Sequence, residues 1–156
     1  MASVMARRSW ARLKSERGVE VVEMAAVLPL LLLVMMGIID FAFMFQRYSV
    51  LTNAAMEGAR VGSLPGYAIP GDVQARVNAY AAAGGVKPAT IDVEAIPVAV
   101  PAAGGGNWPA VQVTVTHVYT LQYLGPMASL FSGTMPTVTL RARSVMRSQV
   151  GAGAGD

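Results

Sequence analysis

The first half of the chain carries one long apolar stretch. Only Asp40 is charged between Met24 and Phe45. Residues 22–45 would extend about 36 Å as a helix, enough to cross a hydrocarbon core of about 30 Å with some tilt. The stretch is too long for the apolar part of a cleaved secretory signal, and a chain of 156 residues has little interior to hide a helix that is apolar on every side. The pattern therefore predicts a membrane-spanning helix over residues 22–45.

Beyond residue 45 the chain keeps a helical period, but its apolar face changes to small side chains. Glu57 and Arg60 lie on other faces of the same helix. Small side chains allow another backbone to approach closely, so this face predicts a packing surface. We expect one helix over about residues 22–63, with residues 46–63 outside the membrane. The small face consists of Leu51, Ala54, Ala55, Gly58, Ala59 and Gly62.

The second half alternates turn signals with short periodic segments. Asp72 is placed to cap a second helix, which Gly84 would end. Three segments of alternating polar and apolar residues predict strands, and one apolar face of the resulting sheet needs a cover. The small face of the first helix is the obvious cover, which gives an α+β fold of two layers. The predicted strands are near residues 90–96, 111–123 and 137–146, with a connector over 124–136 that includes at most a short helical turn.

Composition and charge exclude several classes of function. Hydrophobic residues make up 54% of the chain and charged residues 13%, whereas soluble domains are about 25% charged. Residues 1–17 carry a net charge of +4 and the remainder −1, so no basic patch is left for nucleic acid. The basic residues before the apolar stretch predict a cytoplasmic N-terminus and an outer C-terminal domain. The absence of cysteine excludes disulfides and thiol nucleophiles.

Enzyme chemistry finds little support. His117 is the single histidine, and it falls on the apolar face of the second predicted strand. A lone histidine there is more often a hydrogen-bonded residue or a residue at the edge of a sheet than a metal ligand. A Gly-x-Ser-x-Gly elbow is absent. Gly104–Gly106 is followed by Asn-Trp-Pro rather than by a helix, which disfavours a phosphate cradle. We expect no catalytic activity, no cofactor or metal, and no small-molecule substrate.

Several short motifs stand in a fixed order along the N-terminal helix. Together they resemble the TadE-like family of pseudopilins, which belong to the tight-adherence (Flp) branch of type IV pilus systems. The likeness covers about residues 16–62, and Met24 stands where the family more often has an aromatic residue. The motifs are Arg17-Gly18, Glu23, Leu28-Pro29-Leu30, Gly37-Ile38-Ile39-Asp40-Phe41, Asn53-Ala54-Ala55 and Glu57-Gly58-Ala59-Arg60.

The resemblance implies a prepilin-like precursor. A membrane prepilin peptidase would cut between Gly18 and Val19 on the cytoplasmic side, which leaves a mature chain of 138 residues. That length favours a minor subunit, because the major pilins of this branch are much shorter. The resemblance also implies that Glu23 pairs with the new α-amino group of a neighbouring subunit. From the residues alone, Glu23 could instead lie at headgroup level, favoured by the helix dipole, as we expect for a solvated Glu20.

Two further positions of the helix motif allow alternatives. Pro29 either marks a kink, because it lacks an N–H, or is simply tolerated, as a lone proline in a membrane helix often is. Asp40 falls near the outer interface. Its first interpretation is a snorkelled or hydrated acid, and its second is a contact with a partner in a helical bundle.

These expectations combine into a pilin-like α+β protein. Its long N-terminal helix, transmembrane in the first half, packs on a small antiparallel sheet of about three strands. The expected partners are the prepilin peptidase, other pseudopilins, pilus-assembly platform proteins and membrane lipid. The alternative is an uncleaved single-pass envelope protein whose outer domain binds a partner. The expected segments are a basic leader 1–18, the transmembrane helix 19–45, its continuation 46–63, an extracytoplasmic domain 64–150 and a disordered tail 151–156.

Overall fold

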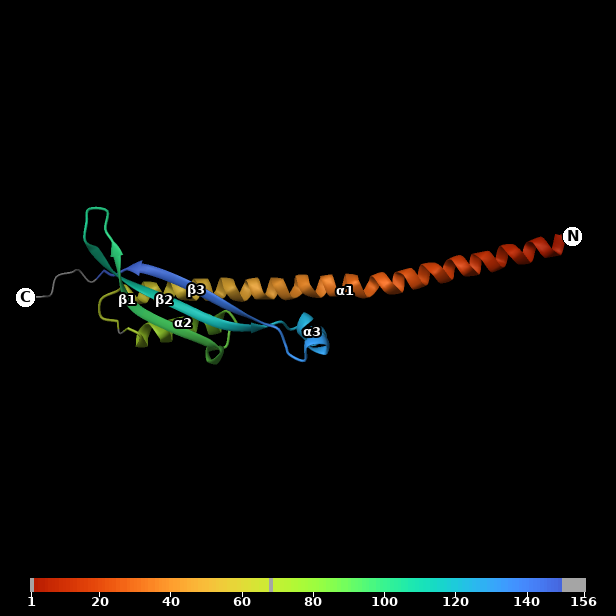
Figure 1. Ribbon diagram of the computed structural model, residues 1–156. Helices are drawn as coiled ribbons and strands as arrows, with labels where there is room; N and C mark the ends of the chain where they lie inside the picture. The colour runs from red at the N-terminus through yellow and green to blue at the C-terminus, as the bar shows by residue number, and fades with distance from the viewer. Residues whose placement is uncertain (1, 68, 150–156) are drawn as a thin grey trace, which may run out of the picture.

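A computed structural model describes residues 2–67 and 69–149 of the chain, with residues 2–17 and 130–132 described by their backbone only. One very long helix forms a rod, and a small sheet with two short helices packs against its C-terminal half (Figure 1). The predicted disordered tail 151–156 lies outside the described residues. In chain order the elements are α1 (Ala2–Gly62), α2 (Gly71–Ala83), a 3-10 turn (Pro88–Thr90), β1 (Ile91–Pro101), β2 (Asn107–Thr120), α3 (Leu124–Ser132) and β3 (Thr137–Arg147).

Helix α1 confirms the predicted single long helix and its end, but it begins much earlier than the predicted residue 22. It runs unbroken through Pro29. Residues 2–17 include three Ala and four Arg, which have high helix propensity, and they contain no Gly or Pro, so the helix can start at Ala2. At the other end the Ser63 hydroxyl donates to the Arg60 carbonyl oxygen at 2.7 Å, and a turn follows in which Gly66 has a φ of 87°.

The sheet has three antiparallel strands, as predicted, and the structure gives their order as β1-β2-β3. Val115 in β2 lies opposite Val93 in β1 and Ala142 in β3, so all three strands turn one apolar face to the core. β1 extends to Pro101, five residues beyond its predicted end, because its pairing with β2 continues to the hairpin turn. β2 stops at Thr120 rather than at residue 123.

The small face of α1 packs against α2 and the sheet, as its side chains predicted. Leu51, Ala54 and Ala59 are completely buried. At Gly58 an added Cβ would lie 2.4 Å from Cγ2 of Val77 in α2, so only glycine permits this approach. Each fully buried valine or leucine side chain contributes about 1.5–3 kcal/mol of hydrophobic stabilisation. The close approach of α1 to α2 and the sheet therefore encloses the hydrophobic core of the domain.

The predicted cap of α2 is wrong by two positions. Pro70, not Asp72, occupies the N-cap, and Asp72 lies in the first turn of a helix that starts at Gly71. An acid in the first turn still interacts favourably with the helix dipole. Asp72 therefore stabilises the same helix end from inside the helix.

Candidate functional site

The segment around the predicted cleavage site is an exposed part of α1. Gly18, Val19 and Glu23 are all helical and exposed, and an added Cβ at Gly18 would meet nothing within 4 Å. Glu23 has no hydrogen-bond or ion-pair partner within the part of the chain that the structure describes. Glu20 is exposed in the same way. Neither the predicted cut nor the predicted pairing of Glu23 is tested by this arrangement.

The apolar stretch that follows has no protein cover. Its most apolar window has a mean hydropathy of 2.5, and none of that window is buried. Leu30 and Leu31, for example, are more than 60% exposed. By length and composition this helix is able to cross a membrane, and its bare apolar surface indicates a membrane-anchored, single-pass protein.

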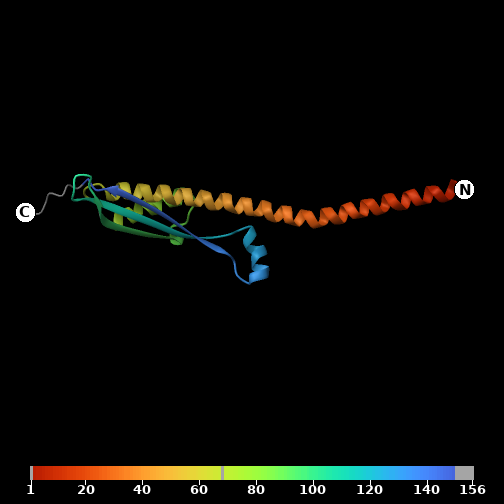
Figure 2. The same ribbon diagram turned by 45° about the horizontal axis from the view of Figure 1, so that its top comes forward.

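The folded domain extends down α1 as far as Gly37. An added Cβ at Gly37 would lie 3.1 Å from Cδ1 of Leu124, the first residue of α3. The packing of the domain therefore overlaps the upper part of the predicted membrane segment 19–45. Pro29 lies inside α1, which continues through it as one helix. Figure 2 shows that the rod of α1 curves only gently.

Asp40 holds the N-terminal end of α3. Its Oδ1 accepts a hydrogen bond from the backbone N–H of Gln122 at 2.9 Å, and its Oδ2 accepts one from Leu124 at 2.7 Å. The N–H of Tyr123 lies 3.2 Å and 3.1 Å from the two oxygens. One carboxylate on α1 thus replaces the side-chain cap that α3 lacks at its own N-cap residue, Tyr123.

The expected hydrated acid at position 40 is therefore wrong. Asp40 is 2% exposed, and its charge is held by three backbone donors and the dipole of α3. The partner is within the same chain rather than in a bundle of helices. Because the N–H groups of residues 122–124 point to this carboxylate, they are unavailable to a strand ladder, which explains why β2 ends at Thr120.

Aromatic side chains reinforce the same junction. The rings of Phe43 on α1 and Tyr123 are stacked, with centroids 6.0 Å apart. Tyr119, at the end of β2, is 5% exposed, and its hydroxyl has no hydrogen-bond partner among the described residues. Burial, together with the nearby charge of Asp40, raises the pKa of Tyr119.

The last block of the helix motif fixes α1 to α2. Nε and Nη2 of Arg76 in α2 donate to Oε1 of Glu57 at 3.1 Å and 2.7 Å. Gly58, the next residue of α1, provides the close contact with Val77. Arg60 is exposed, with no ion-pair partner in the described part of the chain. Glu57 and Gly58 therefore act in packing and orientation within the chain, whereas Arg60 faces solvent.

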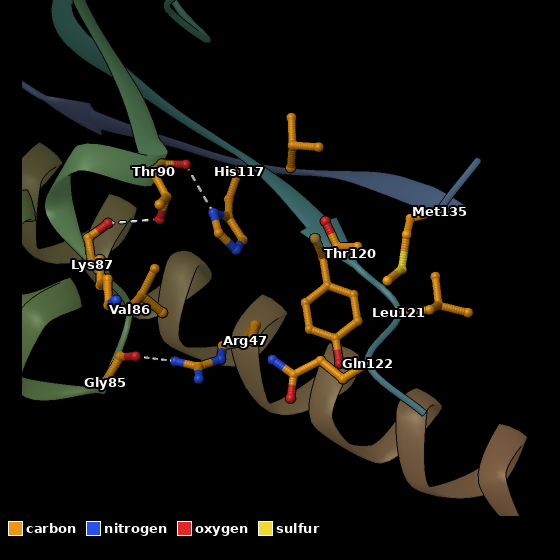
Figure 3. A pocket seen from close by; sticks show the side chains of 12 residues that line it. Arg47, Gly85, Val86, Lys87, Thr90, His117, Thr120, Leu121, Gln122 and Met135 are labelled. Atoms are coloured by element: carbon orange, nitrogen blue, oxygen red, sulfur yellow. Dashed lines mark hydrogen bonds between the residues drawn. The ribbon is translucent and has the colours of Figure 1, made fainter. Parts of the chain in front are cut away.

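A hollow of about 520 Å³ lies between α1, the turn after α2 and the end of β2. Figure 3 shows Arg47 donating to the Gly85 carbonyl oxygen and His117 beside Thr90. Nδ1 of His117 is 2.8 Å from the Thr90 carbonyl oxygen, so this histidine is a satisfied residue of the central strand, at the end where β2 pairs with the first residue of β1. Among the described residues, no group of three His, Asp or Glu side chains gathers as a metal site would require.

Sequence reasoning missed three residues of this site. Tyr123 was expected within a strand, Leu124 in a connector, and Arg76 had no expected role. A signal for the α3 contact was present, because an acid in an apolar helix requires nearby donors if it is not hydrated. The sequence does not say that those donors lie more than eighty residues further along the chain.

The comparisons with known proteins bear on α1. The family model described as TadE-like protein matches residues 18–60, which confirms the resemblance over that segment. The match ends two residues before the end of α1, so α2, the sheet and α3 all lie outside it. Searches of curated proteins and of solved structures gave no match. The family match and the apolar helix together fit a pilus-associated membrane protein.

Proposed function

We propose that this protein is a TadE-like minor pseudopilin, a membrane-anchored structural component of tight-adherence (Flp) pilus assembly. The observation that carries the proposal is Glu23, an exposed acid five residues past Gly18 inside the segment that matches the family. A carboxylate near lipid is costly unless it meets a cation. Since Glu23 has no partner within the described chain, a neighbouring subunit is the natural source of that cation.

In this mechanism a prepilin peptidase on the cytoplasmic side cuts the Gly18–Val19 bond. The cut removes a leader with a net charge of about +4 and creates an α-amino group at Val19. This amine pairs with Glu23 of a neighbouring subunit, so only processed subunits enter the assembly. The outer domain contacts other pseudopilins, and the platform and motor proteins supply the work of extraction.

Gly18 lies within a helix, so the helix must open before a peptidase can cut the chain there. A peptidase cleft takes an extended backbone, so the helix must open locally at the Gly18–Val19 bond. Glycine lowers that cost, because it destabilises a helix by about 0.5–1 kcal/mol relative to alanine. Gly18→Ala should therefore slow processing, and accumulation of the precursor on an immunoblot measures the effect.

Sequencing of the N-terminus distinguishes this proposal from its alternative. The continuity of α1 through Gly18 favours an uncleaved single-pass envelope protein with a partner-binding outer domain. Protein extracted from membranes that contain the peptidase should begin at Val19, and protein from membranes without it should begin at Met1. An N-terminus at Met1 in both preparations would establish the uncleaved alternative.

Substitution of Glu23 and Glu20, one at a time, distinguishes a specific pairing of Glu23 with the new amine from a general effect of negative charge. Glu23→Ala should leave cleavage largely intact but block incorporation into pili, because the new amine loses its partner. Glu20→Ala is the matched control, since Glu20 lies on the same exposed turn and should assemble normally. Normal piliation by the Glu23→Ala protein would remove the pairing role.

We also propose that the role is structural rather than catalytic. The one histidine, His117, lies on the central strand β2, and its Nδ1 is 2.8 Å from the Thr90 carbonyl oxygen. His117→Ala should therefore leave pilus assembly unchanged at an equal protein level. Loss of assembly without a fall in protein level would support a chemical role for this residue.

A further inference from the structure

Helix α3 lies beside the apolar stretch of α1 rather than beside its solvated half. Leu124 contacts Gly37, and Asp40 caps the helix at its start. In Figure 2 α3 projects across the direction of α1 at the end of the sheet that faces the apolar stretch. A helix that crosses a membrane-spanning helix in this way runs roughly along the plane of the membrane.

The depth of α3 follows from the length of α1. If the inner edge of the hydrocarbon lies at Glu23, a thickness of about 30 Å corresponds to about 20 residues and puts the outer edge near Phe43. Asp40 then lies about 4.5 Å and Gly37 about 9 Å inside that edge. Because Leu124, the first residue of α3, lies beside Gly37 and Asp40, α3 starts within the outer boundary of the bilayer.

The chemistry of the segment agrees with this depth. Residues 118–140 contain no charged side chain, although the strands on either side of α3 lead to Arg141 at one end and to the polar His117 at the other. Met127 in α3 is 37% exposed and Met135 just after it is 51% exposed. The exposed apolar surface of α1 therefore continues onto α3 with no exposed charged side chain between the two.

The capping of α3 also suits a place with little water. Backbone N–H groups in lipid must be bonded within the protein, because water does not satisfy them there. Asp40 accepts from the N–H groups of residues 122–124, and Pro126 in the first turn has no N–H to satisfy. An acid is tolerated at this depth because it meets three donors and is hidden from lipid.

We infer that α3 is a second membrane contact, a short interfacial helix whose exposed apolar side chains enter the outer leaflet among the phospholipid acyl chains. This inference rests on the proposed anchoring of the protein by α1. Two contacts at different lateral positions hold the domain against the bilayer, so the sheet cannot rotate freely about the anchor. The occupant of this surface is lipid, not a second copy of the chain.

Spin labels test the inference directly, because the chain has no cysteine of its own. Single substitutions Met127→Cys and Met135→Cys place a label at the α3 surface of the full-length protein. Met35→Cys in the bare stretch of α1 and Met56→Cys on its solvated half are matched controls, since both methionines are 50% exposed. Each protein is reconstituted in vesicles of phosphatidylethanolamine and phosphatidylglycerol. The measured quantity is the collision of each label with oxygen, which enters lipid, and with a water-soluble nickel chelate.

We expect the labels at 127 and 135 to behave like the label at 35, with frequent collisions with oxygen and few with the nickel chelate. The label at 56 should collide frequently with the nickel chelate. Nickel access at 127 and 135 with lipid exposure at 35 would overturn the inference and leave the anchor intact. Nickel access at 35 as well would overturn the anchor itself. Exclusion of both reagents at 127 and 135, with spin–spin broadening, would show contact with a second copy and also overturn the inference.

Discussion

At the scale of single residues, Asp40 joins two parts of the chain that are far apart in sequence. Asp40 is a charged residue in an apolar segment, and it is buried. Three backbone N–H groups donate to its carboxylate and stabilise the charge there. Hydrogen bonds to a charged group contribute about 1.5–3 kcal/mol each, and a buried donor left without a partner costs about 1–3 kcal/mol. The side chain at position 40 therefore has more effect on the fold than its size suggests.

Removal of this carboxylate should release α3. Asp40→Ala leaves three N–H groups without an acceptor and should destabilise the domain by about 3 kcal/mol, which lowers Tm by about 10 °C or more. Asp40→Asn keeps one acceptor oxygen, so its Tm should lie between those of the unsubstituted protein and the Asp40→Ala protein. Thermal unfolding in detergent micelles measures the change, and amide exchange at residues 122–124 locates it. The exposed Asp92→Asn is the matched control, and an unchanged Tm for Asp40→Ala would contradict the capping role.

Tyr119 gives the domain a specific sensitivity to alkaline pH. Burial raises its pKa in the folded protein, so above the ordinary value of about 10 the unfolded chain releases this proton while the folded chain keeps it. The unfolded state then binds fewer protons, and stability falls as pH rises from the unfolded pKa toward the folded one. Tyr119→Phe should flatten the fall of unfolding free energy above pH 10 in urea titrations. An identical fall in both proteins would assign it to other groups.

At the scale of elements, the closest contact is between α1 and α2. Gly58→Ala places a Cβ 2.4 Å from Cγ2 of Val77, a stiff and completely buried side chain, so one of the helices must shift. We expect a loss of about 1–3 kcal/mol in urea unfolding. Gly71→Ala is the control, because a Cβ there meets nothing within 4 Å.

A second substitution checks the cause of that loss. Val77→Ala removes the clashing methyl group, so the double variant should cost less than the sum of the two single variants. Additive costs would place the effect of Gly58→Ala in the backbone rather than in the contact with Val77.

The elements that could be predicted from the sequence are those whose signal is local. The small face of α1 and the alternation in β2 and β3 follow from periodicity, and the structure confirms both. The end of β2 and the existence of α3 depend on Asp40, a residue that periodicity assigns to a different environment. The extent of β1 depends on pairing with β2, which the Pro-rich sequence of its second half does not indicate.

At the scale of the whole molecule, the domain and its anchor share residues 37–45. A fragment that begins at residue 46, the end of the predicted membrane segment, loses Asp40 and the ring of Phe43, whereas one that begins at Gly37 keeps both. In detergent, the longer fragment should protect the amides of α3 from exchange and the shorter one should not. Equal protection in both fragments would mean that α3 folds without α1.

The continuity of α1 determines the orientation of the folded domain relative to the membrane. No loop or hinge separates the membrane stretch from the helix that carries the sheet, so both share one axis. Membrane helices tilt by about 20° on average, and a tilt of that size moves the outer end of the part beyond Gly37, about 39 Å long, sideways by about 13 Å. A change in bilayer thickness, or a push from a neighbouring helix, would therefore move the outer end of the sheet sideways by more than the width of a helix.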